Sequence, residues 1–260
     1  MTAETDDRAT RKVIAQLDGV SLEFGDKVVL KNCSFDIVEG AITCIIGLSG
    51  AGKSTILRLL DGLLLPNAGH VYVRGQDICH MTEEQLIKVR QKISLSFQFA
   101  ALLDSLSVGD NVALPLREHS TMSEKEIQKT VMDALDSVGL AHTYDLLPSE
   151  LSGGMLKRAG FARAIVTRPD LVLYDEPTTG LDPIVTNLIT DTILKLREKL
   201  NGTAVVISHD LQSIFAMADY VAMLFEGAII ACDTVEKIRE STNPIVQQFL
   251  QGSEVGPIPI

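Results

Sequence analysis

Glycines, a lysine and several hydroxyl residues are grouped in one short stretch of the chain. The stretch runs from Gly47 to Thr55 and reads G-L-S-G-A-G-K-S-T, which fits the pattern G-x-x-x-x-G-K-[ST]. Its glycines let successive backbone N–H groups turn towards phosphate oxygens, Lys53 can reach the terminal phosphates, and Ser54 is placed to ligate Mg²⁺. We therefore predict a site for a nucleoside triphosphate. The binding residues predicted in this stretch are Gly47, Ser49, Gly50, Ala51, Gly52, Lys53, Ser54 and Thr55.

The flanks of this stretch have the patterns of a strand and a helix. Ala41–Ile46 is short, apolar and rich in β-branched residues, which is typical of a buried parallel strand. Thr55–Gly62 has apolar residues at helical spacing and ends at a glycine. A glycine-rich turn between a strand and a helix forms a phosphate cradle, because the N-terminus of the helix adds positive potential.

Two adjacent carboxylates follow a second apolar run. Asp170–Glu176 is predicted to be a buried strand that ends with Asp175 and Glu176. Hydrolysis of a nucleotide also needs a second anchor for Mg²⁺ and a group that orients water. We assign the anchor to Asp175 and the general base to Glu176. The alternative is a pair of acids that only ends a strand.

Two further side chains could contact the nucleotide. His209 follows the predicted strand Ala204–Ser208, where an imidazole could hydrogen-bond the terminal phosphate. A single histidine is usually structural, but this position favours a function. Phe24 lies upstream of the cradle, where an aromatic ring could stack on a base, and a place in the core is the equal alternative.

Leu151–Met155 contains a second glycine-rich start of a helix. Ser152 precedes Gly153 and Gly154, so this helix N-terminus is a second potential anion site. Because the chain already has one phosphate cradle, we predict that two chains pair head to tail and that each offers this segment to the nucleotide of the other. A simple helix cap is the alternative.

Composition limits the class of protein. The 260 residues are 46% hydrophobic and 22% charged, as expected for a folded globular protein. The net charge of −11 disfavours a nucleic-acid partner, and ordinary solubility accounts for the acidity. No apolar run is as long as a membrane span and the polar start has no signal-peptide core, so we expect the protein to stay on the side of the membrane where it is made. The cysteines show no C-x-x-C pair and are expected to be buried free thiols: Cys33, Cys44, Cys79 and Cys232.

The order of predicted elements indicates an α/β fold. Val13–Asp18, Ser21–Phe24 and Lys27–Phe35 are expected to form an antiparallel sheet, with a turn at Asp18-Gly19. The pattern loosens between Phe99 and Leu116, and Ser123 then opens an amphipathic helix. The domain prediction is a flexible tail at 1–12, one domain at 13–250 with a helical subdomain inserted at about 99–158, and an extended tail at 251–260.

Together the motifs resemble those of ATP-binding cassette (ABC) ATPases of transporters. The matching segments are Gly47–Thr55 (Walker A), Gln98 (Q-loop), Leu151–Met155 (signature), Leu171–Glu176 (Walker B), Gly180–Asp182 (D-loop) and His209 (switch histidine). Met155 stands where glutamine is usual in the signature, and Leu48 where proline is common. Neither departure removes a catalytic group.

The resemblance implies a P-loop NTPase (RecA-like) core with an N-terminal antiparallel β subdomain and an inserted α-helical subdomain. It implies ATP and Mg²⁺ as cofactors and a homodimer that holds ATP between the Walker A loop of one chain and Ser152–Gly154 of the other. The implied catalytic residues are Lys53, Gln98, Glu176 and His209, and the implied Mg²⁺ ligands are Ser54, Gln98 and Asp175. The other nucleotide contacts are expected from Phe24, Ser152, Gly153, Gly154 and Asp182.

A narrower resemblance concerns the transported cargo. In this family, Phe97–Leu103 and Asp110–His119 occupy the surface that receives the coupling helix of a membrane subunit. Pro115–His119, Met155 and the tail Gln248–Pro259 resemble the ATPases of Mla-type (maintenance of lipid asymmetry) systems. That resemblance implies a peripheral ATPase at the cytoplasmic face of the inner membrane, which works with integral permease subunits and an MCE-domain lipid-binding protein to move phospholipids between membranes.

Other functions are compatible with the same ATPase motifs, because the ATPase does not touch the cargo. One is the ATPase of a small-solute importer, and another is a nucleotide-gated signalling module coupled to a membrane partner. The tail after Gly252 could be held by a neighbouring subunit or be a frayed end.

Overall fold

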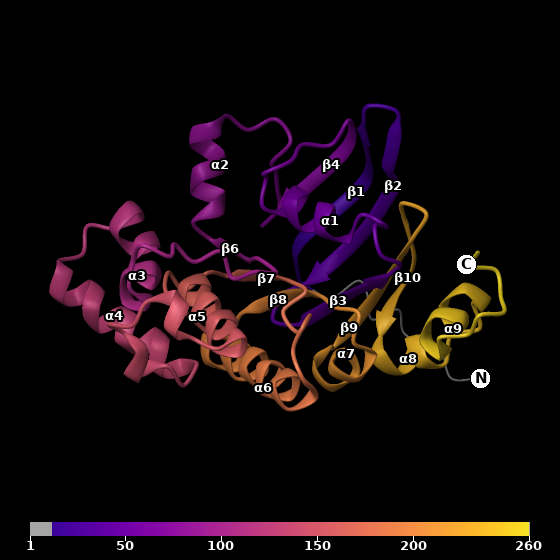
Figure 1. Cartoon of the computed structure of the whole chain (residues 1–260). Coiled ribbons are helices and arrows are strands. Elements are labelled where there is room, and N and C mark those ends of the chain that lie inside the picture. Colours follow the sequence, from indigo (N-terminus) through magenta and orange to yellow (C-terminus); the bar gives the residue numbers. More distant parts are fainter. Residues whose placement is uncertain (1–11, 260) are drawn as a thin grey trace.

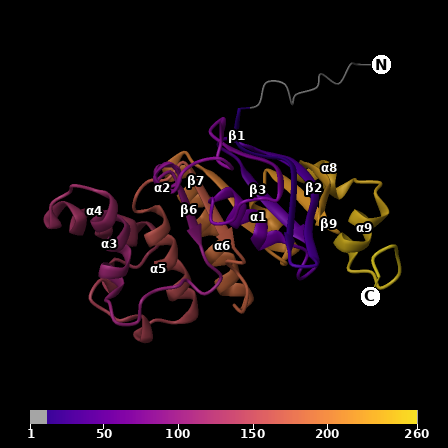
Figure 2. The same cartoon turned by 90° about the horizontal axis from the view of Figure 1, so that it is seen from above.

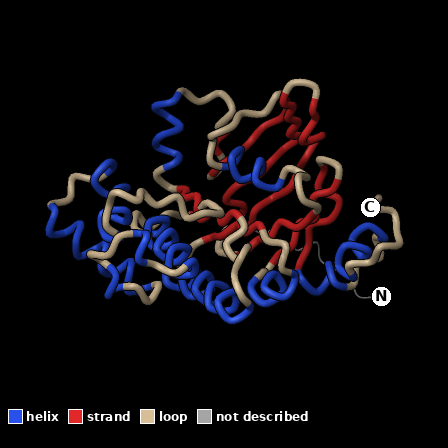
Figure 3. The backbone as a smooth tube through the Cα atoms, in the orientation of Figure 1, coloured by secondary structure: helices blue, strands red, loops and turns tan. Residues whose placement is uncertain are grey.

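The fold is built on two β-sheets with helices around them (Figure 1). The structure is a computed structural model that describes residues 12–259. The flexible tail expected at residues 1–12 lies, except for Lys12, outside the described residues. The tube in Figure 3 separates a strand-rich part from a helical part, and the larger sheet joins the two.

The larger sheet has the strand order β10-β9-β3-β8-β7-β6. All neighbouring strands from β9 to β6 run parallel, and only β10 is antiparallel to its neighbour β9. Its strands are β3 (Ile42–Gly47), β6 (Ile93–Ser96), β7 (Leu171–Asp175), β8 (Thr203–Ile207), β9 (Tyr220–Phe225) and β10 (Ala228–Thr234). Parallel strands of this kind are buried on both faces, which explains why every residue of β3 and β8 is buried.

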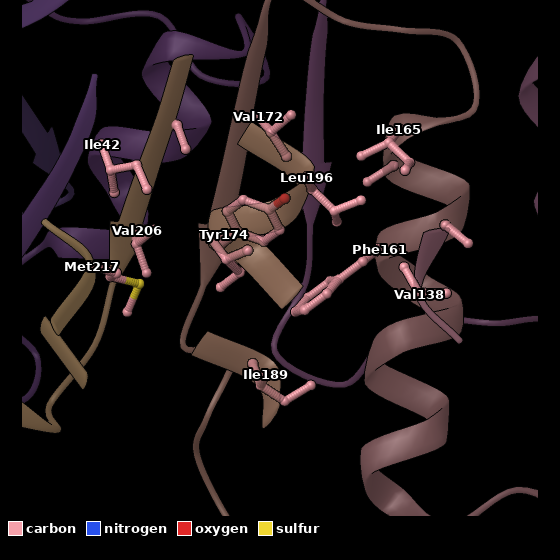
Figure 4. Packing of buried hydrophobic residues seen from close by; sticks show 14 of the residues in the cluster. Ile42, Val138, Phe161, Ile165, Val172, Tyr174, Ile189, Leu196, Val206 and Met217 are labelled. Carbon is pink, nitrogen blue, oxygen red and sulfur yellow. The ribbon is translucent and has the colours of Figure 1, made fainter. Parts of the chain in front are cut away.

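Alternate residues of these strands enter two different hydrophobic cores. Ile42 and Ile46 of β3 belong to the core on the helical side of the sheet, whereas Ile45 belongs to the core on the opposite side. On the helical side, Phe161 of α5 (Gly153–Ile165) meets Tyr174 of β7 edge to face, with ring centroids 5.0 Å apart (Figure 4). Helices such as α5 and the N-terminal strands therefore pack on opposite faces of the same sheet.

The smaller sheet covers the other face of the larger sheet. It has the order β2-β1-β4-β5, with all pairs antiparallel, and consists of β1 (Val13–Phe24), β2 (Lys27–Val38), β4 (Ala68–Val73) and β5 (Gln76–Asp77). The predicted turn at Asp18-Gly19 is wrong, since β1 continues through it. Gly19 has a φ of 62° and the register with β2 shifts between Leu17 and Val20, so this glycine accommodates an irregularity within one strand.

The inserted segment contains a helix that the sequence pattern did not reveal. α3 (Val108–His119) lies where the pattern loosens, and it packs with α4 (Glu124–Ser137) and α5 at one end of the molecule (Figure 2). Pro115 inside α3 hid the helical spacing of Val108, Val112 and Leu116, which are buried. The predicted subdomain boundary near 158 falls inside α5, which is continuous to Ile165.

The remaining helices complete the two faces. They are α1 (Lys53–Leu60), α2 (Glu83–Arg90), α6 (Pro183–Leu200), α7 (Leu211–Met217), α8 (Val235–Arg239) and α9 (Pro244–Gln251), with short 3-10 helices at Ala141–Thr143 and Pro148–Glu150. Within residues 12–259, no helix has the length and apolar character needed to span a membrane. Cys33 and Cys44 are buried as expected, whereas Cys79 and Cys232 are only half-buried.

The segment after α9 is folded back and not extended as predicted. The side chain of Gln248 accepts a hydrogen bond from the backbone N–H of Ile258 (2.6 Å) and donates to the carbonyl oxygens of Ser253 and Ile258. Ile258 is 7% exposed and joins the core on the helical side. The tail is therefore anchored on the helix that precedes it, because its apolar residue is buried there.

Candidate active site

The predicted phosphate cradle lies between β3 and α1, at the carboxyl end of the parallel sheet. Gly47, Gly50 and Gly52 all have positive φ angles, which glycine adopts without strain. A Cβ atom at Gly47 would lie 2.2 Å from the carbonyl oxygen of Leu224, and one at Gly52 would lie 2.9 Å from Cγ1 of Val29. Both backbone conformation and space therefore require glycine at these two positions.

Lys53 lies inside the cradle and is only 5% exposed. Its Nζ donates hydrogen bonds to the carbonyl oxygens of Gly47 (3.0 Å) and Leu48 (2.9 Å). Burial lowers the pKa of Lys53, although the nearby carboxylates of Glu176 and Asp175 act in the opposite direction. Since no carboxylate is within ion-pair distance of Nζ in the part of the chain that the structure describes, a bound phosphate would supply the missing counter-charge.

Ser54 and Asp175 approach each other from α1 and β7. The Ser54 hydroxyl donates a hydrogen bond to Oδ1 of Asp175 at 2.9 Å. Burial raises the pKa of Asp175, and the neighbouring charge of Glu176 adds to this effect, while the bond from Ser54 lowers it. Two oxygen donors, one of them a carboxylate that lacks a full counter-charge, are the kind of ligand set that suits Mg²⁺. These residues therefore fit the predicted metal.

Glu176 is the centre of a polar cluster just beyond β7. Its φ of 48° lies in the left-handed region, and its N–H donates to the carbonyl of Ile207 (3.0 Å), which fixes the turn. The carboxylate accepts a hydrogen bond from Nε2 of Gln98 (3.1 Å) and lies 2.9 Å from Nε2 of His209. A glutamate held in an unfavourable backbone conformation by its surroundings is typical of functional sites.

Two residues that the sequence analysis missed also contact Glu176. The hydroxyl of Thr179 donates to its carboxylate (3.0 Å), and Nζ of Lys157 donates to the carbonyl oxygens of Glu176 (3.3 Å) and Thr179 (2.9 Å). Burial lowers the pKa of Lys157, and the charge of Glu176 raises it. Thr179 could have been found from its position three residues after Glu176, whereas Lys157 comes from a distant helix and gave no local signal.

A cavity of about 290 Å³ connects the cradle with Glu176 and His209. Its wall also includes Phe24, Lys27 and Val29 from the smaller sheet. Phe24 is 51% exposed and is therefore not a core residue. Lys27 was not predicted, although a lysine close to Phe24 adds positive charge where phosphates are expected.

The predicted signature residues do not line this cavity. Ser152 caps α5 by accepting a hydrogen bond from the N–H of Met155 (3.4 Å). Gly153 is exposed and has room for a Cβ atom, since the nearest atom would be 3.9 Å away, whereas a Cβ on buried Gly154 would lie 2.6 Å from Cγ1 of Val185. Packing against α6 thus explains why position 154 requires glycine, but it does not explain the glycine at position 153.

Asp182 is at the start of α6 and also lies outside the cavity. Its carboxylate accepts hydrogen bonds from the N–H groups of Ile184 (2.9 Å) and Val185 (3.0 Å), so it is the N-cap of this helix. Capping of this kind contributes about 1 kcal/mol to helix stability. The structure therefore gives Asp182 a structural role within the chain.

Comparison with known proteins covers most of the chain. Residues 30–179 match the family model described as ABC transporter. The chain is 41% identical over 245 residues to the intermembrane phospholipid transport system ATP-binding protein MlaF of Haemophilus influenzae, with 94% of this chain and 93% of that protein covered. It is 36% identical to the probable ribonucleotide transport ATP-binding protein mkl of Mycobacterium leprae, with 97% of this chain and 73% of that protein covered.

A solved structure shares the fold. The ATP-binding cassette MJ0796, in a dimeric post-hydrolysis state bound to ADP and phosphate, superposes with a TM-score of 0.78 at 30% identity. The match covers 85% of this chain and 98% of that chain. The family match over residues 30–179 extends well beyond the glycine-rich loop and includes Gln98, Glu176 and Ser152.

Proposed function

Because the chain belongs to the ABC transporter family and is an ATPase of that family, we propose that it powers the movement of phospholipids between membranes. The observation that carries the proposal for hydrolysis is the cluster around Glu176, which faces the same cavity as the glycine-rich loop. The support for a lipid cargo is the 41% identity to a phospholipid transport ATP-binding protein over 94% of the chain.

We assign the binding of ATP to the Walker A loop and to Phe24. The backbone N–H groups of Gly47–Thr55 and the ammonium group of Lys53 hold the phosphates, and Phe24 stacks on the adenine. Transfer of the Lys53 ammonium group from the carbonyl oxygens of Gly47 and Leu48 to phosphate oxygens compensates its buried charge. Lys27 strengthens the positive potential of the same cavity.

Glu176 is the proposed general base. Its carboxylate accepts the proton of the water that attacks the γ-phosphorus, as the bond from phosphorus to the bridging oxygen of ADP breaks. Gln98 and Thr179 hold this carboxylate in place, and His209 is within 2.9 Å of it. His209 also reaches the γ-phosphate in this assignment, so the cluster couples the base to the state of the nucleotide.

We propose Mg²⁺ as the metal cofactor, with Ser54, Asp175 and Gln98 as its protein ligands. When bound, the ion neutralises charge on the phosphates. Ser54 and Asp175 already lie within hydrogen-bonding distance of each other. A cation between them would replace the hydrogen bond from Ser54 to Asp175. It would also stabilise the buried negative charge of Asp175.

The active form is proposed to be a homodimer with ATP at the interface. Ser152 and Gly153 are exposed at the N-terminus of α5 and lie apart from the cavity of their own chain. In a head-to-tail pair they close the ATP site of the partner, with the start of the helix directed at the phosphates. The dimeric state of the related cassette MJ0796 supports this arrangement.

The partners proposed for this ATPase are integral permease subunits and an MCE-domain lipid-binding protein. The chain would then bind peripherally at the cytoplasmic face of the inner membrane. Exposed apolar residues near Gln98, among them Phe97 (43% exposed), Phe99 (87%) and Leu103 (50%), favour contact with another protein. These residues link the membrane partner to Glu176 through Gln98.

Purification of the native complex from membranes tests the proposed cargo. The chain is isolated with its partners in mild detergent, and proteins and bound lipids are identified by mass spectrometry. We expect a permease, an MCE-domain protein and enriched phospholipid. Recovery of a permease with a solute-binding protein and no bound phospholipid would instead support an importer. The similarity to a relative named for ribonucleotide transport is the reason to test this alternative.

A further inference from the structure

Three side chains with metal-binding donor atoms gather at the edge of the smaller sheet. His70 lies on β4, Asp77 on β5, and His80 in the segment that leads to α2. One donor atom from each of these residues lies within 4.8 Å of the other two. None of the three lines the nucleotide cavity.

Strand pairing brings His70 and Asp77 together. Asp77 is paired with Tyr72, and His70 precedes Tyr72 by two residues, so the rings of His70 and Tyr72 are on the same face with centroids 5.9 Å apart. Nδ1 of His70 lies 2.8 Å from Oδ2 of Asp77. The other carboxylate oxygen, Oδ1, accepts a hydrogen bond from the N–H of Cys79 (3.0 Å). A second contact thus orients the carboxylate, as is usual for metal-ligating side chains.

His80 supplies the third donor from the other side. Its ring is 6.1 Å from that of His70 between centroids, at an interplanar angle of 71°. The side chain is exposed and, within residues 12–259, makes no hydrogen bond or ion pair. Two ligands on one tetrahedral ion with bonds of about 2.0–2.1 Å lie roughly 3.3 Å apart. The three donor atoms already lie within 4.8 Å of one another, and the exposed position of His80 leaves its side chain room to adjust.

We propose that His70, Asp77 and His80 form a binding site for a divalent transition-metal ion, with Zn²⁺ as the ion that fits best. Two imidazoles and one carboxylate suit zinc and its first-row neighbours, whereas Mg²⁺ and Ca²⁺ prefer sites made only of oxygen atoms. Three protein ligands leave one position of a tetrahedral zinc ion for water. The site is distinct from the Mg²⁺ site at Ser54 and Asp175.

A bound ion would join the β4–β5 hairpin to the segment before α2. Ile78, between Asp77 and His80, is already fully buried. The ion would therefore link the residues on either side of a position that the core holds in place. An ion that binds only the folded chain raises the midpoint of thermal unfolding. The proposal therefore predicts zinc-dependent stabilisation that is independent of nucleotide.

Calorimetric titration of the untagged, full-length chain with Zn²⁺ tests the site. We expect one ion per chain, an increase in Tm, and no displacement by millimolar Mg²⁺. His80→Ala is the main variant, because the His80 side chain is exposed and forms no hydrogen bond with the described part of the chain. It should weaken binding by at least about tenfold and remove the increase in Tm. Asp77→Asn should do the same.

His142→Ala is the matched control, since His142 is also exposed but lies in the helical part of the chain. It should bind Zn²⁺ like the unmodified chain, and all variants should keep their affinity for ATP. The proposal is overturned if the unmodified chain does not bind Zn²⁺ at micromolar concentration. It is equally overturned if His80→Ala and Asp77→Asn bind with unchanged affinity and stoichiometry, because the ion would then occupy other residues.

Discussion

At the scale of single residues, the carboxylate of Glu176 is contacted by side chains from separate parts of the chain. Gln98 comes from the loop after β6, His209 from the loop after β8, and Thr179 from the turn that follows β7, yet all reach one carboxylate. Parallel strands make this possible, because their carboxyl ends open at the same edge of the sheet. Any change in the position of Gln98 therefore acts on the proposed base directly.

Replacement of Glu176 by glutamine tests this role. Glutamine keeps the shape of the side chain but cannot accept a proton, so turnover should fall by roughly 10²–10⁴-fold while the affinity for ATP is retained. Steady-state ATPase assays and equilibrium binding of ATP measure the two quantities. Glu198→Gln, on an exposed position of α6, is the control and should behave like the unmodified chain. Turnover within a factor of two of normal in Glu176→Gln would exclude this residue as the base.

The two glycines of the signature should respond differently to the same substitution. Gly154→Ala places a methyl group 2.6 Å from Val185 and should destabilise the fold by about 1–3 kcal/mol through overpacking. Gly153→Ala makes only an ordinary contact, 3.9 Å from Cδ2 of Leu181, and should leave stability unchanged, but it should lower ATPase activity by at least about tenfold because it obstructs the close approach of a partner chain. Chemical denaturation and ATPase assays separate the effects. Full activity in Gly153→Ala would contradict the proposed interface.

Single motifs of this site were predictable, and the contacts among them were not. The spacing of Gly47–Thr55 and the acidic end of β7 are local signals, so Lys53, Ser54 and Asp175 could be chosen from the sequence. Lys157 could not, since its role depends on the packing of α5 beside the turn after β7. The structure also excludes the core alternative for Phe24, which is exposed and lines the cavity.

At the scale of elements, the two ends of helix α1 have different roles. Its N-terminus forms part of the proposed phosphate cradle, and Asp61 follows its C-terminus, where the helix dipole disfavours negative charge. Burial raises the pKa of Asp61 to about 7, although Arg90 acts to lower it. Arg90 also binds the carbonyl oxygens of Asp61 and Gly62, which holds α2 against the end of α1.

This raised pKa predicts a pH dependence of stability. Between the unfolded value of 3.8 and the folded value of about 7, Asp61 is protonated in the folded state and ionised in the unfolded state. Stability should therefore fall as pH rises through this range. Asp61→Asn removes the ionisation, so its stability relative to the unmodified chain should increase between pH 5 and pH 8, by on the order of 1–4 kcal/mol.

Urea denaturation at both pH values measures the difference. Asp191→Asn, at an exposed position of α6, is the control and should show no such trend. An equal effect of Asp61→Asn at pH 5 and pH 8 would mean that Asp61 is ionised in the folded state at both.

Elements with regular patterns were predicted, and those with interruptions were not. The apolar strands β3, β7 and β8 and the capped helices α2 and α4 have strong local signals. α3 was missed because Pro115 obscured its apolar face, although buried Asn111 stabilises its start through hydrogen bonds with Leu103, Leu106 and Ser107. The fold of the C-terminal tail depends on the side chain of Gln248, which no periodicity can reveal.

At the scale of the whole molecule, we propose that the chain presents half of an ATP site on each of two separate surfaces. The cavity holds the Walker A loop, Glu176 and His209, and exposed Ser152 and Gly153 lie elsewhere, at the start of α5. Two copies related by a two-fold axis would form two complete sites. Binding of ATP would then close the dimer, and hydrolysis would release it.

A mixing experiment tests this central proposal most directly. Lys53→Ala disables the cradle, and Gly153→Asp places a negative charge on the signature at an exposed position that has room for a Cβ atom. Each variant alone should be inactive. In mixed dimers, one of the two sites combines an intact cradle with an intact signature, so an equal mixture should recover about one quarter of the ATPase activity of the unmodified chain. Absence of any recovery, with mixed dimers demonstrated by mass spectrometry, would contradict a site shared between two chains.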